Sequence, residues 1–224
     1  QQNSSSSIDY DGNATIKQRL DNLNVDSYAS LRALTSSQLT NGDVVTVTDD
    51  GIAGNFVIKT GTVTDNGGTL IVFNDDSGRY CERLLVGPVT PEMFGALADG
   101  ATDDIIAINK ALTFGEYKLV GHYAVGSSIN IQNTTNGVWS GCKITALTNN
   151  FNVVNANNKS NFNIVGKHFI TGPGGSGSGV GIYVYECSRY SIDQPEVSGF
   201  QNGIILDGVN VAAGGLGGNR GRQG

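Results

Sequence analysis

The segment of residues 89–112 constrains the fold more than any other part of the chain. Pro91 lies in a short extended piece, which a turn at residues 99–100 separates from a predicted helix. Asp103 and Asp104 suit the first turn of that helix, because negative charge and side-chain oxygens there satisfy free backbone N–H groups. The apolar residues at helical spacing are Ile105, Ile106, Ile108, Ala111 and Leu112. A capping helix followed by a long run of short, Asn/Gly-punctuated strands predicts the start of a β-solenoid.

A repeat of short strands is predicted after residue 117. The expected strand pairs are Val138-Trp139 with Ile144, Phe162–Ile164 with Phe169-Ile170, and Tyr190–Ile192 with Val197, and the expected third strands are Phe151–Val154, Gly181–Val184 and Gly203–Leu206. The offsets between repeats are roughly 22 to 29 residues, within the range of solenoid coils with variable loops. The expected corners are Asn130, Asn133, Asn149, Asn150, Asn157 and Asn158.

The composition favours many short strands joined by tight turns. Of the 224 residues, 32 are Gly and only 15% are charged. Gly and Asn tolerate positive φ, so this mixture argues against a helical bundle or a coiled coil. The net charge of −6 argues against a nucleic-acid partner, because no basic field is present to neutralise phosphates.

The cysteines indicate neither a disulfide framework nor a zinc site. Cys81, Cys142 and Cys187 are far apart in the sequence and form no Cys-x-x-Cys pair. Cys142 and Cys187 lie in strand-like segments and are interpreted as small buried apolar residues. No apolar run approaches the length of a transmembrane helix, and residues 1–7 have neither the positive nor the apolar region of a signal peptide.

No metal or cofactor is predicted. His122 and His168 are far apart and belong to no zinc motif. Asp99, Asp103 and Asp104 form an acidic cluster, but their spacing does not match a calcium loop. Roles in a turn and at a helix start explain these aspartates better.

The amino-terminal segment is expected to be a linker followed by a short helix. Residues 1–12 are polar and Ser-rich. Ile16, Leu20 and Leu23 have helical spacing within residues 13–23, but such a short helix is unstable alone in water. It could pack on the following domain, or it could pair with copies of itself around a three-fold axis. Two turns are too few to decide between these alternatives.

A small β domain is predicted next. Residues 26–34 are expected to form a second short helix with Asp26 or Ser27 as its N-cap. The strands expected in residues 43–86 are Val44–Thr48, Phe56–Ile58 after a turn at Gly54-Asn55, Thr69–Phe73, and Tyr80–Leu85. So small a domain buries little surface and often depends on a partner.

Two parts of this sequence resemble a known family. The pattern PEMFGA…DG.TDD..AI..AL in residues 91–112 resembles the start of the pectate-lyase-like right-handed parallel β-helix, in the form found in bacteriophage tailspikes and capsule depolymerases. Residues 28–34, 43–54 and 64–73 resemble the small amino-terminal domain of such tailspikes. The β-helix motif alone occurs in many secreted and viral proteins, so its combination with this domain is what points to a phage.

The resemblance implies a mainly all-β chain with a short capping helix. It divides into a linker or trimer stub (1–25), a small particle-anchoring β domain (26–88), the β-helix opening motif with its capping helix (89–115), and the first coils of the right-handed parallel β-helix (116–224). It further implies a homotrimer on the virion, attached to phage tail or baseplate proteins. Its expected ligand is a bacterial capsular or other surface polysaccharide, which it would bind and cleave.

The sequence offers few carboxylates for polysaccharide cleavage, which uses a pair of them in hydrolysis. The catalytic candidates lie within one predicted coil and are Glu186, Asp193 and Glu196. Aromatic faces stack on pyranose rings, so the glycan-binding candidates are Tyr183, Tyr185, Arg189 and Tyr190. The alternative is that all seven are ordinary solvated residues on a solenoid face.

Three functions remain open from the sequence. The chain is a depolymerase, either a hydrolase or a lyase, or a non-catalytic adhesion fragment or branching adaptor of a virion. The third is a secreted bacterial pectate-lyase-like enzyme. The Gly-rich residues 212–224 are not expected to cap a solenoid core, so we expect the chain to be the front part of a longer protein.

Overall fold

The structure is a computed structural model that describes residues 9–10, 14–15, 24–35, 39–75, 78–148, 150–174 and 179–208. It divides into two compact units, residues 1–86 and residues 87–224. Each unit has a hydrophobic core of its own.

The first unit is built on a five-stranded sheet with the order β3-β4-β5-β7-β6. Its strands are β3 (Asn24–Val25), β4 (Val44–Val47), β5 (Gly54–Thr60), β6 (Leu70–Val72) and β7 (Arg79–Arg83). Strand β3 is parallel to β4, and the other pairs are antiparallel. The predicted small β domain is confirmed, and its sheet already begins at Asn24, ahead of the boundary expected at residue 26.

The second predicted helix is present as α2 (Tyr28–Ala33), with Ser27 as its N-cap. The Ser27 hydroxyl oxygen accepts a hydrogen bond from the Ser30 N–H at 3.1 Å. The cap satisfies one of the free N–H groups of the first turn, as expected for a serine at this position.

The first predicted helix is wrong at its beginning. Ala14–Thr15 form strand β2, which pairs antiparallel with β1 (Asp9–Tyr10). The apolar spacing covered only two turns, and a pattern that short does not hold a helix without tertiary packing. The residues that defined the pattern, Ile16, Leu20 and Leu23, lie outside the described residues.

The core of the first unit alternates along β4 and β5, as a half-buried sheet requires. Val45, Val47, Phe56 and Ile58 are fully buried. The predicted turn at Gly54-Asn55 is wrong, because Gly54 pairs with Val47 inside the β4–β5 ladder. A Cβ at Gly54 would lie 2.1 Å from the Nη1 atom of the Arg83 guanidinium, so glycine is required there for space and not for a turn.

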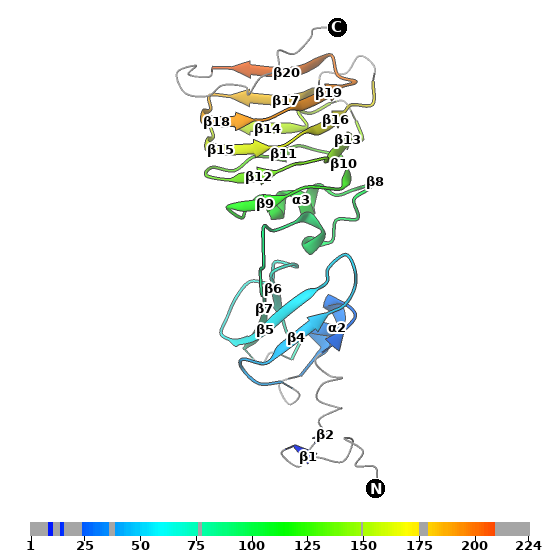
Figure 1. Cartoon of the computed structure of the whole chain (residues 1–224), viewed down its shortest axis with the longest axis vertical. Coiled ribbons are helices and arrows are strands. Elements are labelled where there is room, and N and C mark those ends of the chain that lie inside the picture. The colour runs from blue at the N-terminus through cyan, green and yellow to red at the C-terminus, as the bar shows by residue number, and fades with distance from the viewer. Residues whose placement is uncertain are drawn as a thin grey trace. The chain divides into compact units, whose positions relative to one another are not determined.

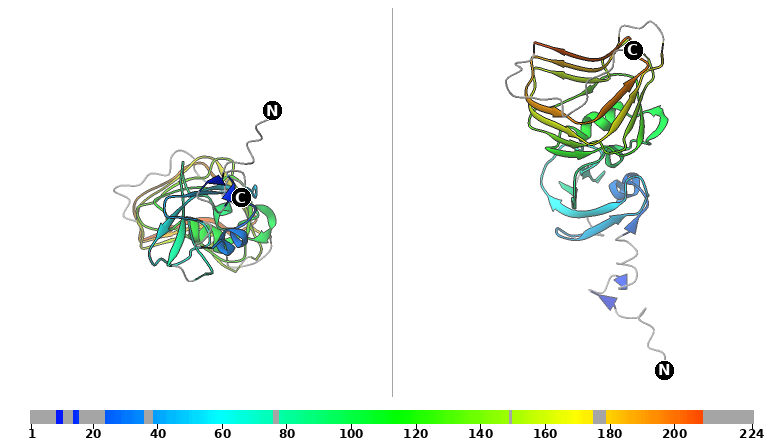
Figure 2. Two further views of the ribbon diagram at one scale, coloured as in Figure 1. Left: turned by 90° about the horizontal axis from the view of Figure 1, so that it is seen from below. Right: turned by 45° about the horizontal axis from the view of Figure 1, so that its top comes forward.

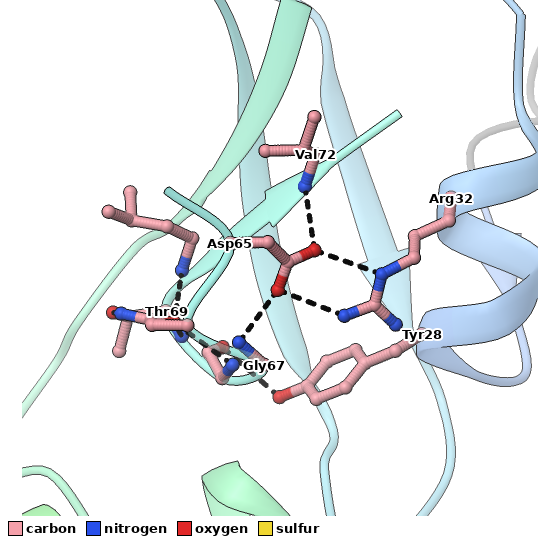
Figure 3. A network of polar contacts seen from close by, with 9 residues as sticks. Tyr28, Arg32, Asp65, Gly67, Thr69 and Val72 are labelled. Carbon is pink, nitrogen blue, oxygen red and sulfur yellow. Dashed lines mark hydrogen bonds and ion pairs between the residues drawn. The ribbon is translucent and has the colours of Figure 1, made fainter. Parts of the chain in front are cut away.

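Asp65 ties α2 to the loop before β6 (Figure 3). Its Oδ2 atom accepts hydrogen bonds from Arg32 Nε at 2.9 Å and from the Val72 N–H at 3.0 Å. Its Oδ1 atom accepts from Arg32 Nη2 at 3.0 Å and from the Gly67 N–H at 2.7 Å. Burial raises the pKa of this carboxyl, but the bonds from Arg32, Val72 and Gly67 outweigh it, and the net pKa is lowered.

Arg83 is the buried cation of the first unit. Its guanidinium donates hydrogen bonds to the carbonyls of Gly68 (3.2 Å), Ala53 (2.8 Å) and Ile52 (2.6 Å). Its Cζ atom lies 4.6 Å from the centroid of the Phe56 ring. Backbone carbonyls and a ring face thus surround this charge, and the hydrogen bonds make its burial tolerable.

The second unit opens with the 3₁₀ helix η2 (Pro91–Phe94), strand β8 (Asp99–Asp103) and helix α3 (Ile105–Ala111). One expectation is corrected. Pro91 begins η2 and does not lie in an extended piece, because its fixed φ and missing N–H suit a helix start. Residues 99–100 begin β8, but the expected turn is present as an irregularity in this strand: Gly100 has a φ of 74°, and Asp99 Oδ1 accepts hydrogen bonds from the Ala101 and Thr102 N–H groups at 2.9 and 2.8 Å.

Asp103 and Asp104 were both expected to bond the first turn of α3, but only Asp103 does so. Asp103 Oδ1 accepts a hydrogen bond from the Ile105 N–H at 3.2 Å and one from the Gly126 N–H at 3.0 Å. Asp104 is the N-cap residue but makes no side-chain cap bond. Its carboxylate accepts instead from the N–H groups of Leu97 (2.8 Å) and Ala98 (3.1 Å), which fixes the preceding loop.

Three parallel sheets follow and form the solenoid (Figure 1). The first contains β9 (Glu116–Lys118), β12 (Asn136–Val138), β15 (Ser160–Val165) and β18 (Ser188–Ile192). The second continues β8 with β10 (His122–Val125), β13 (Lys143–Ala146), β16 (His168–Thr171) and β19 (Pro195–Ser198). The third contains β11 (Ile129–Asn130), β14 (Val154–Asn157), β17 (Val180–Tyr185) and β20 (Asn202–Asp207). Each coil gives one strand to each sheet, so the predicted parallel β-helix is confirmed.

The coils vary in length but stay in register. Partners on adjacent coils lie between 20 residues apart, as Glu116 and Asn136 do, and 28 residues apart, as Ser160 and Ser188 do. Figure 2 shows the coils stacked on one another, with α3 at the end of the stack. Asn158 lies at an expected corner with a φ of 52°. Asn130 and Asn157 were also expected at corners, but they are the last residues of β11 and β14. Asn149 lies outside the described residues.

The solenoid interior is filled by stacked apolar side chains. The Phe162 and Tyr190 rings on adjacent coils are nearly parallel, with centroids 5.2 Å apart. Trp139 is fully buried and meets the His168 ring edge-on. Cys142 and Cys187 are free and buried, as predicted.

Candidate functional site

The third sheet presents two neighbouring outward rows of side chains. One row contains Asn130, Asn155, Tyr183 and Ile205, which pair in register from β11 to β20. The other row contains Asn157, Tyr185 and Asp207. Alternate residues of these strands, such as Ile182 and Val184, point inward and are buried, which fixes the outward direction of the two rows.

Tyr183 and Tyr185 form a pair of parallel rings at the centre of this face. Their centroids lie 6.2 Å apart, and the angle between the ring planes is 5°. Both side chains are partly exposed. Both were predicted as glycan-binding residues, and the structure places them side by side on one face.

Two carboxylates border the tyrosine pair. Glu186 follows β17 at the corner, and its N–H donates a hydrogen bond to the Asp207 carbonyl at 3.0 Å. The neighbouring Glu186 carboxylate raises the pKa of Tyr185, and the negative charge of Asp207 adds to this shift. The predicted Glu186 therefore belongs to the tyrosine site, together with Asp207.

Side-chain amides extend the face along the earlier coils. Asn155 Nδ2 donates a hydrogen bond to Asn130 Oδ1 at 3.2 Å, so the amides of adjacent coils form a ladder. Asn157 Oδ1 accepts a bond from Asn158 Nδ2 at 2.9 Å. The face thus offers aromatic rings beside neutral and acidic hydrogen-bonding groups.

Two of the predicted glycan-binding residues lie elsewhere. Tyr190 is wrong as a surface residue, since it is 8% exposed and stacks on Phe162 inside the solenoid. Strand alternation explains this position, because Tyr190 is an inward residue of β18 like Ile192. Arg189 is exposed, but it belongs to β18 of the first sheet.

Asp193 and Glu196 are not brought to Glu186. They follow β18, whose five residues span about 16 Å at about 3.3 Å per residue. Glu196 instead forms an ion pair with Lys167, with Nζ and Oε1 2.6 Å apart, and Lys167 also lies over the Phe169 ring. The three carboxylate candidates therefore do not converge in one cleft, and their catalytic role stays a prediction.

The sequence interpretation missed Asp207 and the amide ladder as parts of the site. The carboxylate candidates from the sequence do not include Asp207. Its position one coil after Tyr185 could have been found by aligning Gly203–Asp207 with Gly181–Tyr185 as successive third strands. No cluster of three or more metal-ligating side chains occurs among the described residues.

The buried cysteines and His168 offer no reactive group on this surface. Burial raises the pKa of Cys81 to about 12, so its thiol stays protonated. Burial also lowers the pKa of His168, against a bond to the Gly166 carbonyl and the charge of Asp193, which favour the proton. Nor does any helix in the described parts of the chain have the length and apolar character needed to cross a membrane.

No family model and no curated protein matches the chain. Solved structures do match. The enzymatically active domain of tailspike protein 2 from bacteriophage CBA120 aligns with a TM-score of 0.68 and 21% identity, over 82% of this chain and 32% of that chain. The tailspike protein of Acinetobacter baumannii phage AM24 aligns with a TM-score of 0.67 and 15% identity, over 94% of this chain and 41% of that chain.

A third match is gp49 from Acinetobacter baumannii bacteriophage Fri1, a tailspike protein and capsular polysaccharide depolymerase. It aligns with a TM-score of 0.51 and 13% identity, over 77% of this chain and 42% of that chain. The chain spans less than half the length of each of these proteins. The protein has a tailspike-like parallel β-helix fold.

Proposed function

We propose that the protein is a phage tailspike whose β-helix binds bacterial capsular or other surface polysaccharide on the outward face of the sheet β11-β14-β17-β20. The observation that carries this proposal is the parallel pair of Tyr183 and Tyr185, partly exposed and bordered by amides and carboxylates. Aromatic side chains offer apolar faces to the C–H groups of sugar rings, and the polar neighbours offer hydrogen bonds to hydroxyls.

The tailspike resemblance supports the rest of the assignment. In this proposal the small β domain joins the protein to phage tail or baseplate proteins, the protein is a homotrimer on the virion, and the β-helix acts outside the host cell. The domain division proposed from the sequence at residues 26–88 and 116–224 serves these two roles.

Cleavage of the bound polysaccharide is the proposed reaction, with Glu186 and Asp207 as the acid and its partner. Glycoside hydrolysis uses two carboxyl groups about 5 Å apart for retention or about 6.5–9.5 Å apart for inversion. Glu186 and Asp207 lie on adjacent coils with their backbones in hydrogen-bond contact, which is compatible with either separation. Asp193 and Glu196 form a second, separate candidate pair beyond β18.

A non-catalytic adhesin or virion anchor is the second candidate. The observation that favours it is the separation of Glu186 from Asp193 and Glu196 by strand β18. Under this proposal the outward face around Tyr183 and Tyr185, here called the tyrosine face, binds the polymer without cutting it.

A panel of bacterial capsular polysaccharides tests both candidates. Binding would be followed by affinity electrophoresis, and cleavage by new reducing ends and by the absorbance of unsaturated uronates. Binding with reducing ends that disappear in Glu186→Gln and Asp207→Asn, but not in Glu196→Gln, supports hydrolysis at the tyrosine face. Binding without reducing ends supports the adhesin. Loss of cleavage only in Glu196→Gln would place the reaction near Glu196 in β19 and not at Tyr183 and Tyr185.

A further inference from the structure

The charge of the tyrosine face is one-sided. The four strands β11, β14, β17 and β20 contain one charged residue, Asp207. The corner after β17 adds Glu186. The other polar side chains in the two outward rows are the amides of Asn130, Asn155 and Asn157 and the tyrosine hydroxyls.

The electrostatic surroundings of Tyr185 agree with this count. The carboxylates whose charges act on its hydroxyl are those of Glu186 and Asp207. Lys159 follows the corner one coil earlier, and its N–H bonds to Cys187 Sγ at 3.4 Å, while Arg189 lies within β18 of the first sheet. Neither cation is among the groups that act on Tyr185, so the charge around its hydroxyl is negative.

We propose that this face takes polysaccharides whose sugars are uncharged or carry amino groups and that it discriminates against polyuronates. This inference rests on the polysaccharide binding proposed above. A uronate carboxylate beside Tyr185 would lie near two like charges, whereas an ammonium group would pair with them. Removal of the proton next to a uronate carboxylate also calls for nearby positive charge, and the rows of this face supply no cationic side chain.

The experiment compares three forms of one polymer. The polysaccharide from the panel that binds most tightly is used as isolated, after de-N-acetylation or amination, and after oxidation of its C6 hydroxyls to carboxylates. Affinity electrophoresis at low salt gives the three dissociation constants. We expect the oxidised form to bind about tenfold more weakly than the neutral form, which corresponds to about 1.4 kcal/mol, because each added carboxylate would lie near Glu186 and Asp207. The aminated form should bind at least as tightly as the neutral form and lose affinity as salt is added.

The double variant Glu186→Asn/Asp207→Asn isolates the cause. Asn is tolerated at the corner, because Asn158 occupies the equivalent corner one coil earlier with a φ of 52°, close to the 49° of Glu186. We expect this variant to bind the oxidised and neutral forms about equally. Glu116→Gln, at an exposed position of β9 in the first sheet, is the matched control and should keep the wild-type preference. Trp139 fluorescence checks that each variant is folded, since Trp139 is buried in the β-helix.

Two outcomes would overturn the inference in different ways. If the oxidised form binds as tightly as the neutral form and Tyr183→Ala abolishes that binding, the face binds polysaccharide but does not select by charge. If no polymer binds and no variant changes this, the proposed function fails and the inference fails with it.

Discussion

The two units of this protein use polar groups differently. In the first unit, buried Arg83 and the partly exposed Arg32–Asp65 pair join loops to α2 and the sheet, each by several hydrogen bonds. In the coils of the β-helix, most inward side chains are apolar, with Thr135 and His168 as buried polar exceptions, and amide side chains on the outside form ladders between adjacent coils.

The difference follows from how each unit makes its core. A small sheet with one helix has little apolar surface to bury, so its loops are held by charge-assisted hydrogen bonds. A solenoid buries each coil against its neighbours, so its stability is close to a sum over adjacent coils. Its outer faces are then free for binding, and the proposed tyrosine site lies on one of them.

The largest effect is expected from Arg83→Ala in the first unit. The substitution removes the donor to the carbonyls of Ile52 and Ala53 and removes the cation from the Phe56 face, while the Gly68 carbonyl keeps its bond from the Tyr28 hydroxyl. We expect a loss of about 3 kcal/mol, because several charge-assisted hydrogen bonds and the packing of a buried side chain are lost together. Hydrogen exchange by mass spectrometry should show faster exchange in residues 39–75.

Exchange in the β-helix should stay unchanged in that variant, because the two cores are separate. Arg83→Lys keeps the charge but not the fork of donors and should lie between the wild type and Arg83→Ala. Equal exchange in Arg83→Ala and the wild type would mean that the guanidinium network does not hold the unit together.

A smaller loss is expected when the solenoid interior is overfilled. A Cβ at Gly137 would lie 2.5 Å from the Tyr117 hydroxyl oxygen and 2.7 Å from Trp139 Nε1. Gly137→Ala should therefore cost about 1–3 kcal/mol, the usual range for overpacking. Urea unfolding followed by Trp139 fluorescence measures it, and Gly115→Ala, which meets no atom within 4 Å, is the control.

The two units should also differ in their response to acid. Burial lowers the pKa of His168 below 6.5, so the folded β-helix holds this ring neutral while the unfolded chain takes up a proton. The stability contributed by neutral His168 is thus present above pH 6.5 and is lost as the pH falls below that value. The pKa of Asp65 is lowered from 3.8, so this carboxylate affects stability only at more acidic pH. Its contribution to stability is present above pH 3.8 and is lost as the pH falls below that value.

Urea midpoints from Trp139 fluorescence at pH 7.5 and pH 5 test this difference. The midpoint should fall at pH 5 in the wild type, and the fall should be smaller in His168→Phe, which has no titrating ring. An identical fall in both proteins would assign the acid sensitivity to another group.

The smallest effects are expected in the outer ladders. Asn163 donates to Asn136 at 2.9 Å and accepts from Ser191 at 2.8 Å, so Asn163→Ala loses two bonds and should cost about 1 kcal/mol. Asn155 has one ladder bond at 3.2 Å, and Asn155→Ala should cost about 0.5 kcal/mol. The same fluorescence assay ranks them, and a larger loss in Asn155→Ala would contradict the ladder account.

The repeat could be predicted from the sequence because buried and exposed side chains alternate along each strand. Phe162 and Ile164 point inward on β15 and stack on Tyr190 and Ile192 of β18, as the spacing of those strands implied. The capping helix was equally visible, because Ile105 and Ile108 form its buried face. The short helix expected at residues 13–23 failed at Ala14–Thr15, since two turns of pattern carry too little information.

The sequence predicts only part of the candidate site, because residues that are close in sequence are not always close in space. Tyr183, Tyr185 and Glu186 follow one another at one corner and do lie together. Asp193 and Glu196 are also near in sequence, but a whole strand separates them from Glu186. Asp207 is 21 residues beyond Glu186 and still its neighbour, because register between coils and not chain distance sets contacts in a solenoid.

The central claim is that the tyrosine face binds bacterial surface polysaccharide, and the double variant Tyr183→Ala/Tyr185→Ala tests it most directly. Both side chains are partly exposed, so the variant should keep the wild-type urea midpoint by Trp139 fluorescence. Its dissociation constant for the best-bound capsular polysaccharide should rise by about tenfold or more, while Phe169→Ala on another sheet leaves it unchanged. Unchanged binding in the folded double variant, or equal loss in Phe169→Ala, would contradict the account and place the polysaccharide on a different face.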